Sequence, residues 1–453
     1  MPDTIAAIAT ASAAAAVGIV RLSGAETRRV LAALFTPVNG RSAAELPLRR
    51  MTYGTVRDAE GRTLDHALAV VFSAGHSYTG EESAELHCHG SPVVLQEVLR
   101  AAFAAGARQA RAGEFTERAF LNGKMDLTEA EAVIDLIDAE TADAAANAAG
   151  QIAGAIRKRI DPVYDSWVDI CAHFHAVLDY PDEDIDPFEL SRLESALQAS
   201  SRTLSALLAS CHRGRMVRSG VRVTILGSPN AGKSSLLNAL SGFDRVIVTD
   251  IPGTTRDTVE QTVTLGRHLV RLVDTAGIRD TEDVIEKIGV DRSVEAAKDC
   301  DAALFVVDDS RPLTDEDRRA MDAALEAPEA IAVLNKQDLG AVIEPSDLPF
   351  SYIVPVSCKD GTGFDLLEQA FDMLFPDDAP CDGSLLTNAR QADAIVRAKK
   401  SVDAALRSLR AGFTPDAVLV DLEAAMRALG EVTGRTMRED ITNRIFERFC
   451  VGK

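Results

Sequence analysis

The sequence predicts a mixed fold, α/β plus all-α, in which an inserted α/β domain interrupts a helical domain. Strand-like and helix-like periodicity alternates over about the first 120 residues and again over 217–375. The segments 126–215 and 385–450 have mainly helical periodicity. One interrupted helical domain is the simplest account, although two separate helical domains would give the same pattern. The expected boundaries are 1–120 for the N-terminal α/β domain, 121–215 and 377–453 for the helical domain, and 216–376 for the inserted domain.

The composition restricts the kinds of partner. The chain has 453 residues, is 46% hydrophobic and 26% charged, and has a formal net charge of -21. Such an acidic chain is not attracted to nucleic acid by its overall field, so an RNA contact requires a local basic patch. Residues 388–410, with six Lys or Arg against two acids, are either such a patch or an ordinary solvated helix face.

The cysteines and the N-terminus point to the cytoplasm. The seven cysteines form no CxxC pair and are odd in number, which favours free thiols in a reducing compartment. Residues 4–20 are uncharged, but they lack the basic start of a secretory signal, so we expect a buried strand and loop. No stretch is long enough to span a bilayer, and no membrane contact is expected.

The first domain reads as strands and helices in a regular order. "VGIVRLSG" and "AELHCHG" are strand-like, "ETRRVLAALF" and "PVVLQEVLRAAFAAG" are helix-like, and "MTYGTVRD" with "LDHALAVVFS" resembles a hairpin. In the helical part, Thr128 and Glu131 have the spacing of a capping box. The acidic run "DYPDEDIDP" at 179–187 is expected to be a solvated turn.

A phosphate-binding loop is the strongest motif. A strand ends at Leu226, Gly227 to Ser234 spell GxxxxGKS, and a helix follows. Glycines let the backbone wrap around phosphates, and the amides at the helix N-terminus point at them. Lys233 is expected to reach the β- and γ-phosphates, and Ser234 to bind magnesium.

Three further motifs follow in the order of a GTPase domain. "DTAG" comes after the strand "HLVRLV" and places Asp274 near magnesium and the Gly277 amide near the γ-phosphate. "NKQD" ends the strand "AIAVLN", and its Asp338 can accept two hydrogens from the guanine edge, which adenine does not offer. "SCK" then supplies a loop near the guanine oxygen. Between the first two motifs, "VIVTDIPGTTRD" is the candidate switch loop, in which Thr254 and Thr255 are possible cation ligands.

Hydrolysis needs an unusual arrangement. Ile278 stands where many GTPases have a water-orienting glutamine, and neither Arg256 nor Arg279 can be assigned as an arginine finger. A side-chain oxygen of Asn230 can complete a monovalent cation site that replaces the guanidinium. The best candidate to orient water is Glu286, and its competitors are Asp280, Glu282 and Asp283.

The motifs together resemble the MnmE (TrmE) family of bacterial tRNA-modification GTPases, in the TrmE–Era–EngA-like superfamily. The matching stretches run from "GIVRLSG" and "SYTGEESAELHCHGSP" through "RAGEFTERAFLNGKMDLTEAEAVIDLI" and "DTAGIRDTEDVIEKIGV" to the terminal "RIFERFCVGK". The resemblance implies an N-terminal domain that dimerises and binds folate. It also implies a potassium-stimulated GTP hydrolase that is active when two GTPase domains meet.

The resemblance assigns roles to residues of this chain. Glu286 would orient the catalytic water, Ser234 and Thr255 would bind Mg²⁺, and K⁺ would be held by Asn230, Thr249, Ile251 and Thr254. Folate would contact Arg21, Glu81, Lys124 and Lys453, with Cys450 a possible functional thiol nearby. The residues expected to contact GTP are Asn230, Ala231, Gly232, Lys233, Ser234, Ser235, Thr249, Asp250, Ile251, Pro252, Gly253, Thr254, Thr255, Asp274, Thr275, Ala276, Gly277, Asn335, Lys336, Asp338, Ser357, Cys358 and Lys359.

The implied function is modification of tRNA. A homodimer would join a FAD-dependent MnmG (GidA) subunit in a heterotetramer and convert C5 of the wobble uridine of certain tRNAs to aminomethyl or carboxymethylaminomethyl derivatives. The one-carbon unit would come from 5,10-methylene- or 5-formyl-tetrahydrofolate. The alternative is a ribosome-assembly or signalling GTPase switch without RNA chemistry. One departure from the family is "ASAAAAVG" at 11–18, where members commonly have a Gly- and Arg-containing loop; alanines adopt positive φ only at a cost, so a different loop shape is expected.

Overall fold

The computed structural model describes 3–179, 190–243, 261–273, 295–376, 381–436, 445–446, 449 and 451–452. The chain divides into two compact units. Unit 1 consists of Met1–Ile137, Ala148–Leu208 and Ala389–Lys453, and unit 2 of Asp138–Asn147 and Ala209–Asn388. The acidic run at 179–187 lies outside the described residues except for Asp179. No helix of the described part is long and apolar enough to cross a membrane.

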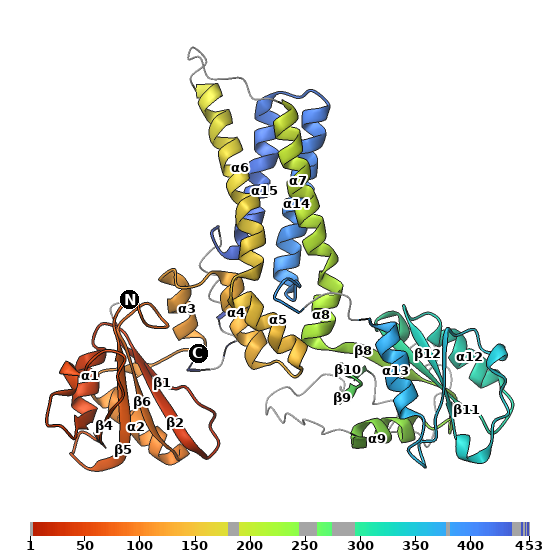
Figure 1. Cartoon of the computed structure of the whole chain (residues 1–453), viewed down its shortest axis with the longest axis horizontal. Helices are drawn as coiled ribbons and strands as arrows, with labels where there is room; N and C mark the ends of the chain where they lie inside the picture. The colour runs from red at the N-terminus through yellow and green to blue at the C-terminus, as the bar shows by residue number, and fades with distance from the viewer. Residues whose placement is uncertain are drawn as a thin grey trace. The chain divides into compact units, whose positions relative to one another are not determined.

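A seven-stranded sheet forms the N-terminal part of unit 1 (Figure 1). Its order is β3-β4-β5-β6-β2-β1-β7; all neighbours are antiparallel except β1 and β7. The strands are β1 (Ile5–Ile8), β2 (Ala15–Ser23), β3 (Phe35–Pro37), β4 (Thr52–Arg57), β5 (Thr63–Phe72), β6 (Ser83–Gly90) and β7 (Arg108–Gln109). The apolar faces of α1 (Thr27–Leu34) and α2 (Pro92–Ala104) share one core with the sheet. The predicted strands, the hairpin of β4 and β5, and both helices are therefore confirmed.

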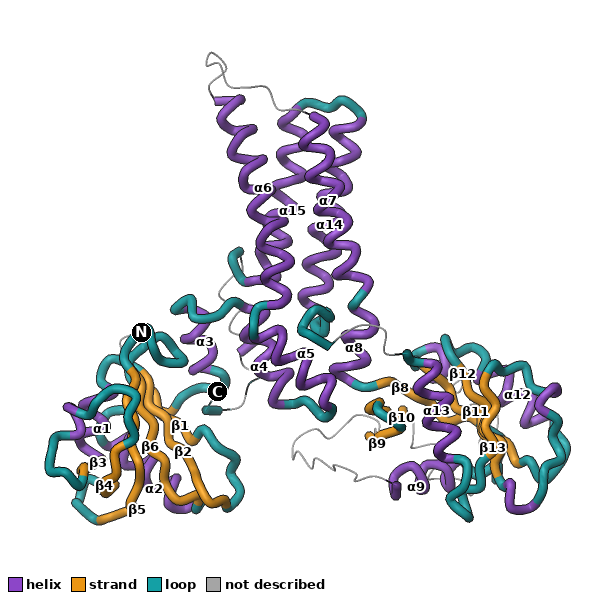
Figure 2. The backbone as a smooth tube through the Cα atoms, viewed as in Figure 1, coloured by secondary structure: helices purple, strands orange, loops and turns teal. Residues whose placement is uncertain are grey.

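Helices make up the rest of unit 1 and lead into unit 2. They are α3 (Glu114–Leu121), α4 (Leu127–Ile137), α5 (Ala142–Ile152), α6 (Ala155–Asp179), α7 (Leu190–Ala209), α8 (Cys211–Ser219), α14 (Ala389–Arg410) and α15 (Pro415–Thr433). Four of them, α6, α7, α14 and α15, run side by side (Figures 1 and 2). Trp167 on α6 is fully buried and donates to Ser200 Oγ on α7 at 3.0 Å. A single bundle is thus assembled from both sides of the insertion.

The cap of α4 differs from the one expected, and most basic residues of α14 are paired with acids. The capping box at the start of α4 is formed by Asp126 and Glu129, not by Thr128 and Glu131. Asp126 Oδ1 accepts from the Glu129 amide, and the Asp126 amide donates to Glu129 Oε2, because the helix begins one residue before Thr128. On α14, four of the six basic residues pair with acids: Arg390, Arg397, Lys399 and Arg410. These pairings favour a structural helix face over a basic patch for RNA.

The C-terminal segment returns to the N-terminal sheet. Val451 forms a bridge with Ala112, and Phe446 packs with Leu127 in a small cluster. Gly113 has φ +66, and a side chain there would meet the Phe446 carbonyl oxygen at 2.5 Å. This glycine therefore permits the close approach of the tail to the loop before α3.

Unit 2 contains a six-stranded, mainly parallel sheet with the order β13-β12-β11-β8-β10-β9. Among its described strands, only β9 and β10 pair antiparallel. Its strands are β8 (Val221–Leu226), β9 (Gln261–Leu265), β10 (His268–Val273), β11 (Ala302–Asp308), β12 (Ala330–Asn335) and β13 (Tyr352–Pro355). Besides α8, the described helices of this unit include α9 (Lys233–Phe243), α12 (Asp315–Ala324) and α13 (Phe364–Leu374). β8, β11 and β12 are almost wholly buried, as expected for parallel strands covered on both faces.

The two ends of the insertion lie beside each other within unit 2. The amide of Leu386 donates to Ser210 Oγ at 3.1 Å, and Arg218 on α8 donates to the Thr387 carbonyl oxygen at 3.4 Å. A side chain on Gly214 would lie 2.0 Å from the carbonyl oxygen of Leu386. Helix α8 and the returning chain are therefore in direct backbone contact.

Candidate functional site

A cavity of about 820 Å³ lies at the carboxyl ends of the parallel strands of unit 2. Ligands of open α/β sheets bind at this edge. The cavity is lined by three of the predicted motifs at once: Pro229, Asn230, Gly232, Lys233, Ser234 and Ser235, then Asn335, Lys336, Asp338 and Leu339, then Cys358 and Lys359. The fold therefore brings together segments more than a hundred residues apart in the sequence.

The phosphate loop has the backbone that its glycines permit. A side chain on Gly227 would lie 2.2 Å from the Val306 carbonyl oxygen, and Gly232 has φ +102. Asn230 also has positive φ, at 63°, which its short polar side chain tolerates better than most. Lys233 begins α9, and its Nζ donates to the carbonyl oxygens of Gly227 and Ser228 at 2.8 Å. Burial lowers the pKa of Lys233, against an opposing effect of the Asp317 charge.

The "NKQD" loop is fixed to the phosphate loop. Asn335 Nδ2 donates to the Ala231 carbonyl oxygen at 3.0 Å, and its Oδ1 accepts from the Cys358 amide at 3.3 Å. Lys336 adopts φ +67, and its ammonium group lies 2.6 Å from Asp308 Oδ2. These contacts fix the conformation of the "NKQD" loop beside the phosphate loop.

Asp338 is held as an ionised acceptor at the cavity. Its oxygens accept from Ser357 Oγ at 3.1 Å and from Lys359 Nζ at 3.2 Å. The bond from Lys359 is the main reason that the pKa of Asp338 lies below its ordinary value. An ionised carboxylate accepts two hydrogen bonds, as recognition of the guanine N1 and N2 edge requires.

Several predicted residues lie outside the described part of the chain. They are the switch-loop residues Thr249, Asp250, Ile251, Pro252, Gly253, Thr254 and Thr255, the "DTAG" residues Asp274, Thr275, Ala276 and Gly277, the water-orienting candidate Glu286, and Cys450 and Lys453. Their roles stay predictions.

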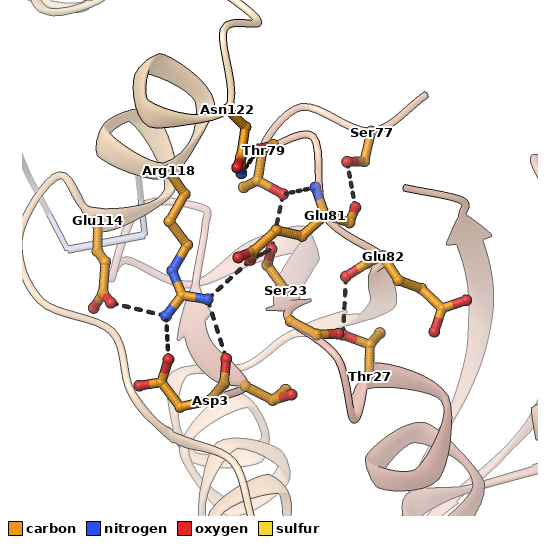
Figure 3. A network of polar contacts seen from close by, with 12 residues as sticks. Asp3, Ser23, Thr27, Ser77, Thr79, Glu81, Glu82, Glu114, Arg118 and Asn122 are labelled. Carbon is orange, nitrogen blue, oxygen red and sulfur yellow. Dashed lines mark hydrogen bonds and ion pairs between the residues drawn. The ribbon is translucent and has the colours of Figure 1, made fainter. Parts of the chain in front are cut away.

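A second polar site lies in the N-terminal domain (Figure 3). The guanidinium of Arg118, whose side chain is 1% exposed, lies between three carboxylates. It donates to Glu81 Oε2 at 2.8 Å, to Asp3 Oδ1 at 2.9 Å and to Glu114 Oε1 at 3.0 Å. Ser23 Oγ donates to the same Glu81 oxygen at 2.9 Å. Glu81 is therefore held from two sides.

Two of the other predicted folate residues, Arg21 and Lys124, lie in the same domain. The Arg21 guanidinium carbon is 5.7 Å from the ring centroids of both Tyr78 and Phe115, and Arg21 pairs with Glu85 at 3.0 Å. Lys124 is exposed, and its Nζ donates to the Gly75 carbonyl oxygen at 2.9 Å. Arg21 and Glu81 are joined through β2, because Ser23 follows Arg21 on that strand by two residues.

Comparison with known proteins gives matches over the whole chain. A model described as "MnmE helical domain" matches 127–450, and one described as "GTP-binding protein TrmE N-terminus" matches 4–124. The tRNA modification GTPase MnmE of Roseiflexus sp. (strain RS-1) is 44% identical over 464 residues, covering 100% of this chain and 99% of that protein. That of Thermoanaerobacter sp. (strain X514) is 39% identical over 458 residues, with the same coverage.

The chain belongs to the MnmE family of tRNA modification GTPases. This membership favours the tRNA-modification hypothesis over a switch without RNA chemistry. It also confirms the resemblance that the motifs indicated.

The alanine-rich segment at 11–18, which departs from the MnmE pattern, has an ordinary backbone. None of the alanines at 13–16 has positive φ; among described non-glycine residues only Arg49, Asn230 and Lys336 do. β2 begins at Ala15 instead, and Gly90 opposite it leaves no room for a side chain, since one would lie 2.4 Å from the Ala15 carbonyl oxygen. The alanine-rich segment is accommodated without the strained backbone that a substitution for glycine suggested.

Sequence reasoning did not identify Arg118, Glu114 or Asp317 in this MnmE-family chain. Arg118 and Glu114 fall within the stretch "RAGEFTERAFLNGK", but nothing local indicates that Arg118 is buried or that it faces Glu81, 37 residues away. For Asp317, a signal was available: Thr314 and Asp317 have the spacing of a capping box, and the structure forms it.

Proposed function

We propose that this MnmE-family chain is a potassium-stimulated GTP hydrolase that modifies C5 of the wobble uridine of certain tRNAs. It would act as a cytoplasmic homodimer with a FAD-dependent MnmG (GidA) subunit, in a heterotetramer, and use a one-carbon folate. The observation that carries the nucleotide part is the cavity where the phosphate loop, "NKQD" and "SCK" meet. Ionised Asp338 at its edge supports guanine over adenine.

The residues present suit the proposed cations. Ser234 and Asn230 both line the cavity, and their side-chain oxygens are ligands of the hard type that Mg²⁺ and K⁺ prefer. Asn230 lies within the phosphate loop and has φ 63°. Among the described residues there is no group of three or more His, Cys, Asp and Glu that could hold a metal ion.

A comparison of salts tests the hydrolytic mechanism. GTP turnover of the full chain should be much faster in KCl than in NaCl at equal ionic strength, because the bound cation would stabilise charge on the phosphates. Glu286→Ala should abolish turnover and leave GTP binding intact, whereas Glu282→Ala is the matched control that keeps turnover. Near-normal turnover by Glu286→Ala would exclude Glu286 as the water-orienting group.

The ion-pair network supports a folate site at Glu81. A pterin offers ring N–H and amino donors, and a carboxylate fixed in one orientation recognises such a pair. Arg118 and Ser23 provide that fixation. Glu81→Gln should weaken binding of 5-formyl-tetrahydrofolate by at least about tenfold, measured by equilibrium dialysis, while Glu60→Gln, an exposed control in the same domain, should not.

Nucleoside analysis tests the tRNA chemistry. Bulk tRNA from a strain that lacks this gene should lose the C5 modification of the wobble uridine when it is digested and analysed by mass spectrometry. The gene supplied on a plasmid should restore the modification. Unchanged modification in the deletion strain would contradict the proposal in favour of a switch without RNA chemistry.

A further inference from the structure

The start of the phosphate loop is tied to helix α12 by a buried carboxylate. Ser228 is the second residue of the loop and is 3% exposed. Its hydroxyl donates to Asp317 Oδ1 at 2.5 Å, and the Asp317 side chain is fully buried. The two residues are 89 positions apart, so this bond fixes the loop to an element outside the nucleotide motifs.

The two oxygens of Asp317 have separate tasks. Oδ2 accepts from the backbone amide of Thr314 at 2.9 Å and from its hydroxyl at 2.7 Å, which completes the capping box of α12. Oδ1 accepts from Ser228. A helix cap alone requires only the bonds with Thr314, so the bond to Ser228 is an additional feature.

Arg311 neutralises this carboxylate and extends the connection. Its Nη1 lies 2.7 Å from Asp317 Oδ2, and its Nη2 lies 3.3 Å from Ser228 Oγ. Its Nε is 3.9 Å from Asp308 Oδ2, the same oxygen that pairs with Lys336 of the "NKQD" loop. A buried negative charge beside the phosphates would oppose an anionic ligand, and the guanidinium offsets that charge.

We infer that Ser228, Asp317 and Arg311 form a tether that positions the phosphate loop for nucleotide binding. The loop carbonyls of Gly227 and Ser228 that accept from Lys233 Nζ belong to the tethered segment, so the tether also fixes the place from which this lysine reaches the phosphates. Asp308 extends this series of contacts to the "NKQD" loop, which is proposed to bind guanine, because Arg311 and Lys336 both pair with Asp308 Oδ2. The three are positioning residues for GTP binding by a member of this GTPase family; the inference needs neither folate nor potassium.

The test compares the tether with the helix cap in the full-length chain. Ser228→Ala removes the tether and keeps the cap, whereas Thr314→Ala removes the Thr314 hydroxyl and keeps the tether. Fluorescent N-methylanthraniloyl GDP with Mg²⁺ reports affinity and release by stopped flow, and thermal unfolding reports stability. Ser228→Ala should weaken GDP binding by about five- to tenfold, mainly through faster release. Thr314→Ala should lower the melting temperature and leave the affinity unchanged.

A double-mutant cycle separates positioning from general damage. Asp317→Asn should also weaken GDP binding, because a neutral amide oxygen accepts the Ser228 hydroxyl less strongly than a carboxylate does. The variant with both Ser228→Ala and Asp317→Asn should bind GDP no more weakly than the worse single variant, because the two changes act on the same connection. Three results would overturn the inference: wild-type affinity in Ser228→Ala, additive effects in the double variant, or tighter GDP binding by Asp317→Asn. The last would mean that the Asp317 charge acts only by repelling phosphate. If Asp317→Asn fails to fold, the GDP affinities of Ser228→Ala and Thr314→Ala still test whether the tether positions the phosphate loop.

Discussion

Glu114 and Asp317 are buried carboxylates that play corresponding parts in the two units. Each lies in the first turn of a helix, accepts from a backbone amide near the helix start, and pairs with arginine. Burial alone would raise the pKa of each, but the hydrogen bonds outweigh it and lower the pKa to about 2 in both. A helix N-terminus and a guanidinium together keep the charge buried at these positions.

Residue-level prediction from sequence depends on where the partners lie. The phosphate loop and "NKQD" are recognisable because each function is carried by residues within a few positions of one another. Arg118 and Asp317 act on residues 37 and 89 positions away, and such pairings follow from the tertiary fold, which one sequence does not specify. Local spacing is therefore sufficient to recognise the phosphate loop and "NKQD", but not the buried charges that pair with distant residues.

Acid unfolding should report on Glu114. Bonds from Arg108, the Arg111 backbone amide and Arg118 outweigh burial and lower the pKa of Glu114 from 4.5 to about 2 on folding. Two more carboxylates share these arginines: Glu117 accepts from Arg111, and Asp3 accepts from Arg118. A lowered folded-state pKa gives stability that is present above about pH 4.5 and is lost as pH falls towards 2; for this shift it amounts to about 3 kcal/mol. Glu114→Gln should remove that pH dependence, as measured by urea unfolding between pH 5 and 2. A variant with the wild-type slope would contradict this assignment.

Cys358 should be a poor nucleophile although it lines the nucleotide cavity. Burial, with a smaller contribution from the Asp338 charge, raises the pKa of its thiol to about 11. At pH 8 only about 0.1% is then thiolate, and the thiolate is the reactive form. Alkylation by iodoacetamide, followed by peptide mass spectrometry, should be at least about a hundredfold slower than for glutathione, and saturating GDP should slow it further. Rapid labelling with GDP bound would show that Cys358 does not line the nucleotide site.

Among the elements, helix boundaries were predicted less well than helix identities. Helix α4 was expected from its periodicity, but its cap is Asp126, two residues before the predicted Thr128. Asp and Thr both cap helices, so sequence spacing permits either choice, and the contact of α4 with the C-terminal segment around Phe446 depends on tertiary packing. For α8, propensity is misleading for the same reason: Gly214 is unfavourable within a helix, yet packing requires it.

Gly214→Ala in α8 should destabilise the chain. In an exposed helix this substitution stabilises by about 1 kcal/mol. Here the new methyl group would lie 2.0 Å from the Leu386 carbonyl oxygen, which is backbone and cannot move aside cheaply. We expect a net loss of about 1–3 kcal/mol, measured by denaturant unfolding of the full chain. His212→Ala, an exposed position on the same helix, should be neutral or slightly stabilising; equal effects of the two variants would contradict the packing argument.

At the scale of the whole molecule, the nucleotide site and the ion-pair network belong to different compact units. The mixed fold class was predictable because runs of alternating and helical periodicity are long. The predicted domain boundaries stay predictions. Short segments at the junctions, such as α8 and the stretch around Leu386, have little periodicity of their own, so sequence pattern alone cannot assign them.

GDP should stabilise one unit selectively. A ligand that binds only the folded state at a hundred times its dissociation constant stabilises it by about 2.7 kcal/mol. For a unit of this size, that raises the melting temperature by roughly 5–10 °C. Scanning calorimetry of the full chain with GDP and Mg²⁺ should shift the transition of unit 2 and leave that of unit 1 within about a degree. Lys233→Ala should abolish the shift, and an equal shift of both transitions would show that the units unfold together.

The contact between Ser210 and Leu386 also bears on how such a chain could arise and be redesigned. Because the backbone leaves and returns at points joined by a 3.1 Å hydrogen bond, the gap left by everything between them could be closed by a very short linker. The GTPase portion is therefore an insertion whose two ends lie next to each other. Its sequence could be exchanged for another with closely spaced ends while the helices on either side remain continuous with the same neighbours.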